Sequence, residues 1–137
     1  MGVLHYVFSN VFGGAAVGAT GSEFSFQVFA PGQETGFVHT HKTHEELYFF
    51  LSRAGEFQVD GRVFPVTEGS VVRGALAGKR SVRNNGTKPL VMLCVQYREE
   101  TFTASDAADG EISGEAVCGN RLCCGMLPGF LYRKPGD

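Results

Sequence analysis

The chain of 137 residues contains no tryptophan, and only 19% of its residues are charged. No segment approaches the roughly twenty apolar residues that a membrane helix needs. The twelve Lys and Arg residues are scattered and the net charge is −2, so the basic patch typical of nucleic-acid binding is missing. The first residues lack a basic segment followed by an apolar run, the pattern of a secretory signal. We therefore expect a cytoplasmic protein without nucleic-acid or membrane partners.

Cysteine is also scarce, with four residues at positions 94, 118, 123 and 124. Without a secretory signal we do not expect disulfide bonds. The group Cys118, Cys123 and Cys124 lacks both the CxxC spacing and the neighbouring histidines of a zinc site. These cysteines are therefore predicted to be reduced thiols.

Glycine and phenylalanine, by contrast, are abundant, with nineteen and twelve residues. Frequent turn residues between short stretches with period-two alternation indicate an all-β sandwich or barrel. Beyond one helical turn at 106–109, no amphipathic helix is predicted. The chain is interpreted as a single domain, 1–137, with its core at about 23–98, an N-terminal strand and a C-terminal extension. The predicted strands are 23–29, 37–41, 46–51, 56–59, 62–66, 70–73, 81–83 and 90–97.

Three of the four histidines lie within six residues, at positions 39, 41 and 44. On an extended strand His39 and His41 present their rings to the same side. Glu46, at the start of the next strand, adds a carboxylate at a loop's distance. Imidazole and carboxylate together suit one divalent ion such as Zn, Fe, Mn or Ni and are too nitrogen-rich for calcium.

The pattern His39-x-His41, four residues, then Glu46 resembles the first motif of the cupin superfamily. The family's leading Gly stands six positions before the first His, whereas Gly32 stands seven before it. Arg53 stands where a later Gly is usual, so either Arg53 adopts a left-handed backbone or the turn is built around Gly55. The run from 41 to 48 resembles small single-domain bacterial cupins. The resemblance implies a double-stranded β-helix, or jelly-roll barrel.

The second cupin motif is recognisable between Gly69 and Asn85. Gly69 matches its opening Gly, Gly78 its second Gly and Asn85 its closing Asn. Leu76 replaces the usual Pro. Ser81 stands at the position of the family's remaining metal-binding His. The resemblance therefore implies three metal ligands, His39, His41 and Glu46, in place of four.

Two neighbours of these ligands are alternatives if the register differs by one residue. His44, expected in the connecting loop, is a substitute ligand if it turns inward. Glu45 is expected to point away from Glu46 once the strand begins.

Five further residues fall on the predicted cavity face or on strands near it, and are substrate-binding candidates. An inward Arg would receive a substrate carboxylate or phosphate, because a buried guanidinium needs an anionic partner. The aromatic members are equally consistent with ordinary core. The candidates are Tyr48, Phe50, Arg73, Arg83 and Gln96.

The leading hypothesis is a metal-binding cupin that acts on a small organic molecule, as a dioxygenase or an isomerase. The alternative is a non-enzymatic module that binds a small acid or sugar beside a degenerate metal site. A homodimer is expected, because exposed sheet edges in small sandwiches are usually covered by a second subunit.

Overall fold

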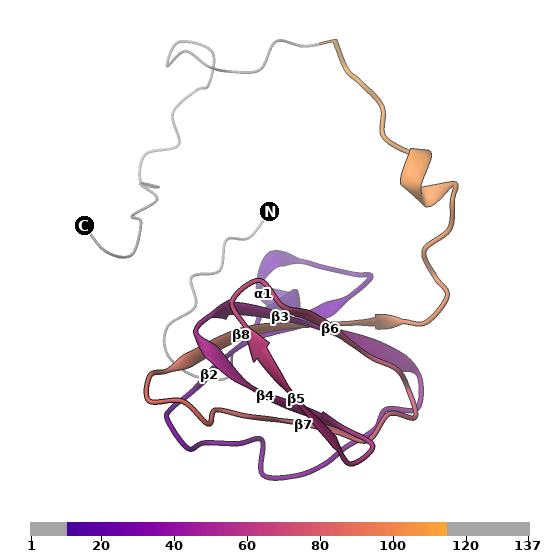
Figure 1. The fold of residues 1–137 in the computed structure, drawn as a ribbon. Helices are drawn as coiled ribbons and strands as arrows, with labels where there is room; N and C mark the ends of the chain where they lie inside the picture. Colours follow the sequence, from indigo (N-terminus) through magenta and orange to yellow (C-terminus); the bar gives the residue numbers. More distant parts are fainter. Residues whose placement is uncertain (1–10, 115–137) are drawn as a thin grey trace, which may run out of the picture. The chain divides into compact units, whose positions relative to one another are not determined.

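The computed structural model describes residues 11–114 and divides the chain after Thr101. The regular secondary structure of residues 11–101 is almost entirely β-strand, arranged in two antiparallel sheets that face each other (Figure 1). Residues 102–114 contain a single 3-10 helix, η1 (Asp106–Ala108). The predicted all-β class is confirmed. The other elements are β1 (Val11–Phe12), α1 (Gly14–Val17), β2 (Glu23–Phe29), β3 (His44–Ser52), β4 (Ala54–Val59), β5 (Arg62–Thr67), β6 (Val71–Gly74), β7 (Arg80–Arg83) and β8 (Leu90–Arg98).

The larger sheet has the strand order β1-β2-β8-β3-β6, and the smaller sheet has the order β5-β4-β7. Strand β3 lies between β8 and β6, and its residues 46–49 are paired on both sides. Glu46 pairs with Gln96 of β8 and with Gly74 of β6, and Tyr48 pairs with Cys94. Because residues directly opposite each other share a face of the sheet, these side chains point into the same space.

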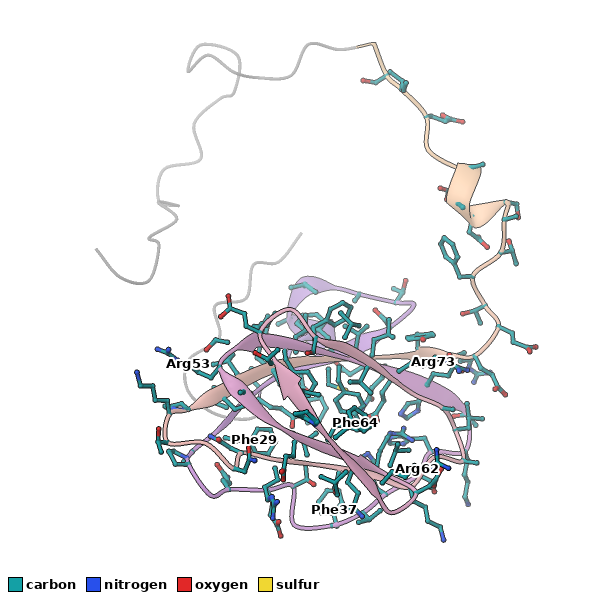
Figure 2. The ribbon with its side chains drawn as sticks, in the orientation of Figure 1. Phe29, Phe37, Arg53, Arg62, Phe64 and Arg73 are labelled. Atoms are coloured by element: carbon teal, nitrogen blue, oxygen red, sulfur yellow. The ribbon has the colours of Figure 1, made fainter. Side chains whose placement is uncertain are left out.

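The core fills the space between the two sheets, and alternate residues of the central strands contribute to it, such as Leu90, Met92 and Cys94 of β8. Phe50, proposed as a cavity residue, is 1% exposed and belongs to this core. Its inward direction follows the predicted alternation, but it does not line the cavity described below. Figure 2 labels Phe29 and Phe64, two other aromatic residues that pack in this region.

The segment that carries His39 and His41 was predicted as a strand over 37–41. The structure assigns it only an isolated bridge between His39 and Arg80 on the free edge of β7. Thr35 N donates to Val82 O and His39 N donates to Arg80 O. The chain therefore advances four residues, from 35 to 39, along a stretch where β7 advances only two, from 82 to 80. The extra residues form a bulge that begins at Gly36, with φ of +77°. Within the bulge Phe37 is 64% exposed, whereas His39, after it, pairs again with β7.

Arg53 adopts the left-handed backbone that was one of the two alternatives for its turn, with φ of +72°. Gly55 is instead a buried strand residue, where a Cβ would lie 2.7 Å from Arg83 O and from Leu90 Cδ2. The turn is therefore built at Arg53, at a backbone cost on the order of 1 kcal/mol.

Within residues 11–114, no helix is long and apolar enough to cross a membrane. The prediction for Cys118, Cys123 and Cys124 falls outside the described residues.

Candidate metal centre

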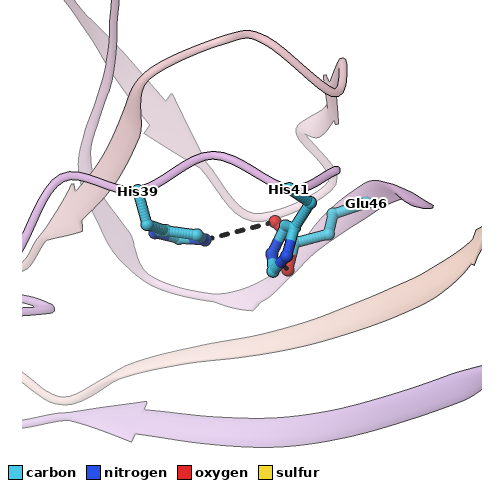
Figure 3. A group of neighbouring side chains, drawn as sticks. All are labelled: His39, His41 and Glu46. Atoms are coloured by element: carbon cyan, nitrogen blue, oxygen red, sulfur yellow. Dashed lines mark hydrogen bonds and ion pairs between the residues drawn. The ribbon is translucent and has the colours of Figure 1, made fainter. Parts of the chain in front are cut away.

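Three predicted ligands converge at the start of β3. One ligand atom from each of His39, His41 and Glu46 lies within 4.8 Å of the other two. His41 Nε2 lies 3.0 Å from Glu46 Oε1, and His39 Nε2 lies 3.5 Å from Glu46 Oε2. Figure 3 shows both rings turned toward the carboxylate. Glu46 is 3% exposed, whereas each imidazole keeps about a quarter of its side-chain surface accessible.

These separations fit a shared ion. Ligand atoms about 2.1 Å from one ion, at angles between 90° and 109°, lie roughly 3.0 to 3.4 Å apart. The two nitrogen-to-oxygen distances of 3.0 and 3.5 Å are close to that range. Two imidazoles and a carboxylate are also a donor set that first-row divalent metals accept. The residues present therefore fit one divalent ion, bound by three protein groups.

Both oxygens of the Glu46 carboxylate accept hydrogen bonds from other side chains. Its Oε1 accepts a hydrogen bond from Gln96 Nε2 at 3.1 Å, and its Oε2 accepts one from Arg80 Nε at 2.8 Å. The Tyr48 hydroxyl also donates to Oε2. Burial by itself would raise the pKa of Glu46, but the hydrogen bonds from Tyr48 and Arg80 and the charge of Arg80 lower it to about 2. Glu46 is thus ionised at any physiological pH.

The Tyr48 hydroxyl and the Cys94 thiol beside this carboxylate remain neutral. Burial and the neighbouring Glu46 raise the pKa of the Tyr48 hydroxyl and of the Cys94 thiol far above their usual ranges. Both side chains are almost fully buried. Tyr48 therefore acts as a hydrogen-bond donor beside Glu46, and Glu46 and Arg80 form a buried ion pair in the wall of the site.

Arg80 is the inner residue that the sequence interpretation missed. The second-motif alignment and strand parity assigned Ser81 and Arg83 to the cavity side. In the structure Ser81 borders the cavity, Arg83 does not, and the buried side chains of β7 are those of Arg80 and Val82. Val82 pairs with the core residue Phe57, so Arg80 and Val82 face inward, with exposures of 0% and 2%.

Arg83 is exposed and forms an ion pair with Glu56 on the outer surface. It therefore does not face the cavity. Alternation from an inward Val82 is a sequence signal that points to Arg80, but the sequence alone does not exclude the opposite register, in which Ser81 and Arg83 face inward.

The same shift applies to the closing Asn of the motif. Asn84, not Asn85, is fully buried. Its Nδ2 donates to the carbonyl oxygens of Phe29 and Lys88, each at 2.8 Å, and its Oδ1 accepts from Gly86 N. Asn84 thus fixes the turn that returns the chain from β7 to β8.

Gly74 provides the room that Arg80 needs. A Cβ at this position would lie 2.6 Å from Arg80 Nε and 2.8 Å from its Cδ. We expect Gly74→Ala to displace the guanidinium and to destabilise the protein by about 1–3 kcal/mol, as overpacking of a core does. Urea unfolding measures the change. Gly21→Ala, where no atom lies within 4 Å of the new Cβ, is the control and should leave stability nearly unchanged.

His44 lies in β3 and not in the loop where it was expected. Its ring stacks against His41, with 3.8 Å between ring centroids and a tilt of 35°. Burial lowers its pKa, and the neighbouring His41 lowers it further. Among the described residues His44 is not part of the convergent group of ligand atoms, so its contact is with a ligand and not with the ion position.

Glu45 and Arg73 lie on the opposite face of the sheet. Glu45 points away from Glu46, as alternation predicted, and forms an ion pair with Arg73. The Arg73 side chain is 60% exposed, and Figure 2 labels it at the periphery of the strands. Arg73 therefore does not face the cavity, contrary to the expectation that it binds substrate.

A cavity of about 520 Å³ opens beside the three ligands. This volume is within the range of small-molecule sites. Tyr48 and Gln96, two of the predicted substrate-binding residues, line it together with Ser81. Most of the other lining is apolar or carries neutral amide groups. The remaining lining residues are Phe12, Gln27, Val28, Phe29, Gln33, Glu34, Thr35, Phe37, Val82, Met92 and Cys94.

Comparison with known proteins agrees with this architecture. The family model of the cupin domain matches residues 25–96. A cupin protein from Bacteroides fragilis has a similar structure, with a TM-score of 0.76, 28% identity, and coverage of 82% of this chain and 95% of that one.

Two further proteins are similar over shorter lengths. A protein of Acidithiobacillus ferrooxidans provisionally named a sugar phosphate isomerase has a TM-score of 0.60 and 30% identity, covering 65% of this chain and 58% of that one. An uncharacterised protein of Methanocaldococcus jannaschii is 32% identical over 60 residues, which are 44% of this chain and 48% of that protein. The chain thus spans about half the length of this curated relative.

Proposed function

The chain belongs to the cupin family and has its double-stranded β-helix fold, and on that basis we propose that it is a metal-binding cupin acting on a small organic molecule. The observation that carries the proposal is the convergence of His39, His41 and Glu46 beside the 520 Å³ cavity. When bound, the ion would supply a Lewis acid or a centre that activates oxygen.

The chain's own residues have separate roles in this proposal. His39, His41 and Glu46 hold the ion, and the Gln96 amide fixes the direction of Glu46 Oε1 through its hydrogen bond. The apolar walls around Phe29 and Met92 exclude water from one side of the cavity. Amide groups such as Gln27 are placed to orient a polar substrate.

Metal content is the first test of the proposal. Protein purified without chelators should contain about one equivalent of a transition metal per chain by elemental analysis. His41→Ala should remove it, because only two ligands would remain. His44→Phe is the matched control: it preserves the ring stacked on His41, lies outside the ligand group, and should retain the metal. The proposal is contradicted if purified wild-type protein contains no metal and does not bind metal added to it.

The reaction class is either a dioxygenase or an isomerase, and these differ in their need for oxygen. The similarity to the Acidithiobacillus ferrooxidans protein supports the isomerase. Product formation from a panel of small acids and sugars, followed by NMR with and without air, separates the two. An isomerase works equally well under both conditions, whereas a dioxygenase consumes oxygen in step with its substrate.

The second candidate function is a binding module without catalysis. The observation that favours it is that Arg80, Tyr48 and Gln96 already provide hydrogen bonds to both oxygens of Glu46. Such a carboxylate is stable without an ion. Native mass spectrometry that finds a bound organic molecule and no metal supports this second function.

A homodimer is part of the proposal and involves the outer face of the larger sheet. Leu93, opposite both Phe26 and Phe49, lies at the centre of this face, and Leu51 and Val71 are 40% and 54% exposed. Apolar patches of this kind mark protein interfaces. Light scattering after size-exclusion chromatography should give twice the mass of one chain, and Leu93→Arg should give a monomer. A monomeric wild-type protein excludes the dimer.

A further inference from the structure

Arg80 is a fixed cation in the wall of the candidate metal centre. Its side chain is fully buried. Its Nη1 donates to the carbonyl oxygens of Ala75 and Gly78, at 2.7 and 2.8 Å, while its Nε donates to Glu46 Oε2. A guanidinium does not lose its proton in a protein, so this position carries a permanent positive charge.

The charge of Arg80 cancels that of Glu46. A centre with two neutral imidazoles and one carboxylate has a net charge of −1, and a divalent ion bound there would leave +1. With Arg80 bonded to the same carboxylate, the group of charges is neutral before the ion arrives. With a divalent ion bound, the net charge of the ion, Glu46 and Arg80 together is therefore +2. The site is buried, so this charge is poorly screened.

Among the described residues, the cavity lining offers an anion no Lys or Arg side chain. Arg73 and Arg83, the two arginines expected to receive a carboxylate or phosphate, pair with Glu45 and Glu56 outside the cavity. Glu34 also lines the cavity and adds negative charge. An anionic ligand consequently finds its positive partner only at the ion, with Arg80 behind it.

We infer that Arg80 makes the open coordination positions of the ion selective for anionic ligands, so that a small carboxylate or other oxyanion binds together with the metal. The inference rests on the proposed metal binding and adds the substrate class. Arg80 acts through Glu46 and through its charge, so it is a positioning residue and not a metal ligand. The positive charge of Arg80 also repels the metal ion and weakens its binding when no anion is present. Metal and anion therefore bind cooperatively.

The test compares a charged and a neutral probe of the same positions. The full-length protein is loaded with Co²⁺ at pH 8, and azide and imidazole are titrated separately while the visible absorption of the ion is recorded. In Arg80→Met we expect azide to bind at least about tenfold more weakly and Co²⁺ alone to bind at least about tenfold more tightly, because one buried positive charge is lost. Imidazole affinity should change much less, because imidazole carries no charge.

Three further variants separate charge from structure. Arg80→Gln retains a hydrogen-bond donor without the charge and should behave as Arg80→Met. It replaces Arg80→Met in the test if that variant does not fold. Arg80→Lys retains the charge and should keep the preference for azide. Arg83→Met, on the same strand but facing outward, should behave as wild type.

Two outcomes overturn the proposal in distinguishable ways. Wild-type protein that does not bind Co²⁺ refutes the metal centre and the inference with it. Protein that binds Co²⁺ but loses azide and imidazole affinity equally in Arg80→Met and Arg80→Gln refutes the inference alone.

Discussion

Replacement of Arg80 by Met in chelator-treated protein should lower the free energy of unfolding by about 3–5 kcal/mol. Glu46 is 3% exposed, and its ion pair with Arg80 is closed to solvent. Removing the cation leaves a buried carboxylate with only the neutral donors Tyr48 and Gln96 and two partly exposed imidazoles. Urea unfolding at pH 7 measures the loss.

The control for this result is Arg83→Met on the same strand. Arg83 pairs with Glu56 at the surface, with 54% of its side chain exposed, so its removal should cost less than about 1 kcal/mol. A saturating divalent ion should recover part of the stability that Arg80→Met loses, since it replaces the missing positive charge. Equal destabilisation by the two variants would show that the Arg80–Glu46 pair contributes little to the fold.

Acid should remove a contribution to stability that depends on Glu46. The pKa of Glu46 is lowered from an ordinary value of 4.5 to about 2 in the folded protein. Because the folded-state value is the lower one, the contribution is complete above pH 4.5 and is lost as the pH falls from 4.5 toward 2. Its size is on the order of 3 kcal/mol, at 1.36 kcal/mol for each pH unit.

The measurement is the difference in unfolding free energy between wild type and Glu46→Gln, both free of metal, at several values of pH. The difference should be constant from pH 7 to 5 and should shrink below 4.5. Glu56→Gln, which removes a carboxylate from an exposed pair, is the control for general charge effects. A difference that does not change down to pH 3 contradicts the assigned role of Glu46.

The sequence by itself was sufficient for the features that depend on local spacing. Alternation identified most of the strands, although the predicted strand 37–41 forms only an isolated bridge. The four residues between His41 and Glu46 were enough to bring both rings to one carboxylate. Alternation also placed Glu45 opposite to Glu46, since that relation holds within one strand. The chain's resemblance to the cupins follows from these same short motifs.

Tertiary structure alone decided which residues complete the site from other strands. Alignment and parity assigned Ser81 and Arg83 to the cavity, and only Ser81 borders it. A register shift of one residue reverses the face of every side chain on a strand, so the sequence alone left open which residues of β7 are buried. The pairing of Val82 with Phe57 sets that register, and it turns Arg80 inward. Strand pairing and the space left by Gly74 are long-range properties. The three ligands could therefore be identified from the sequence, whereas the buried cation beside them could not.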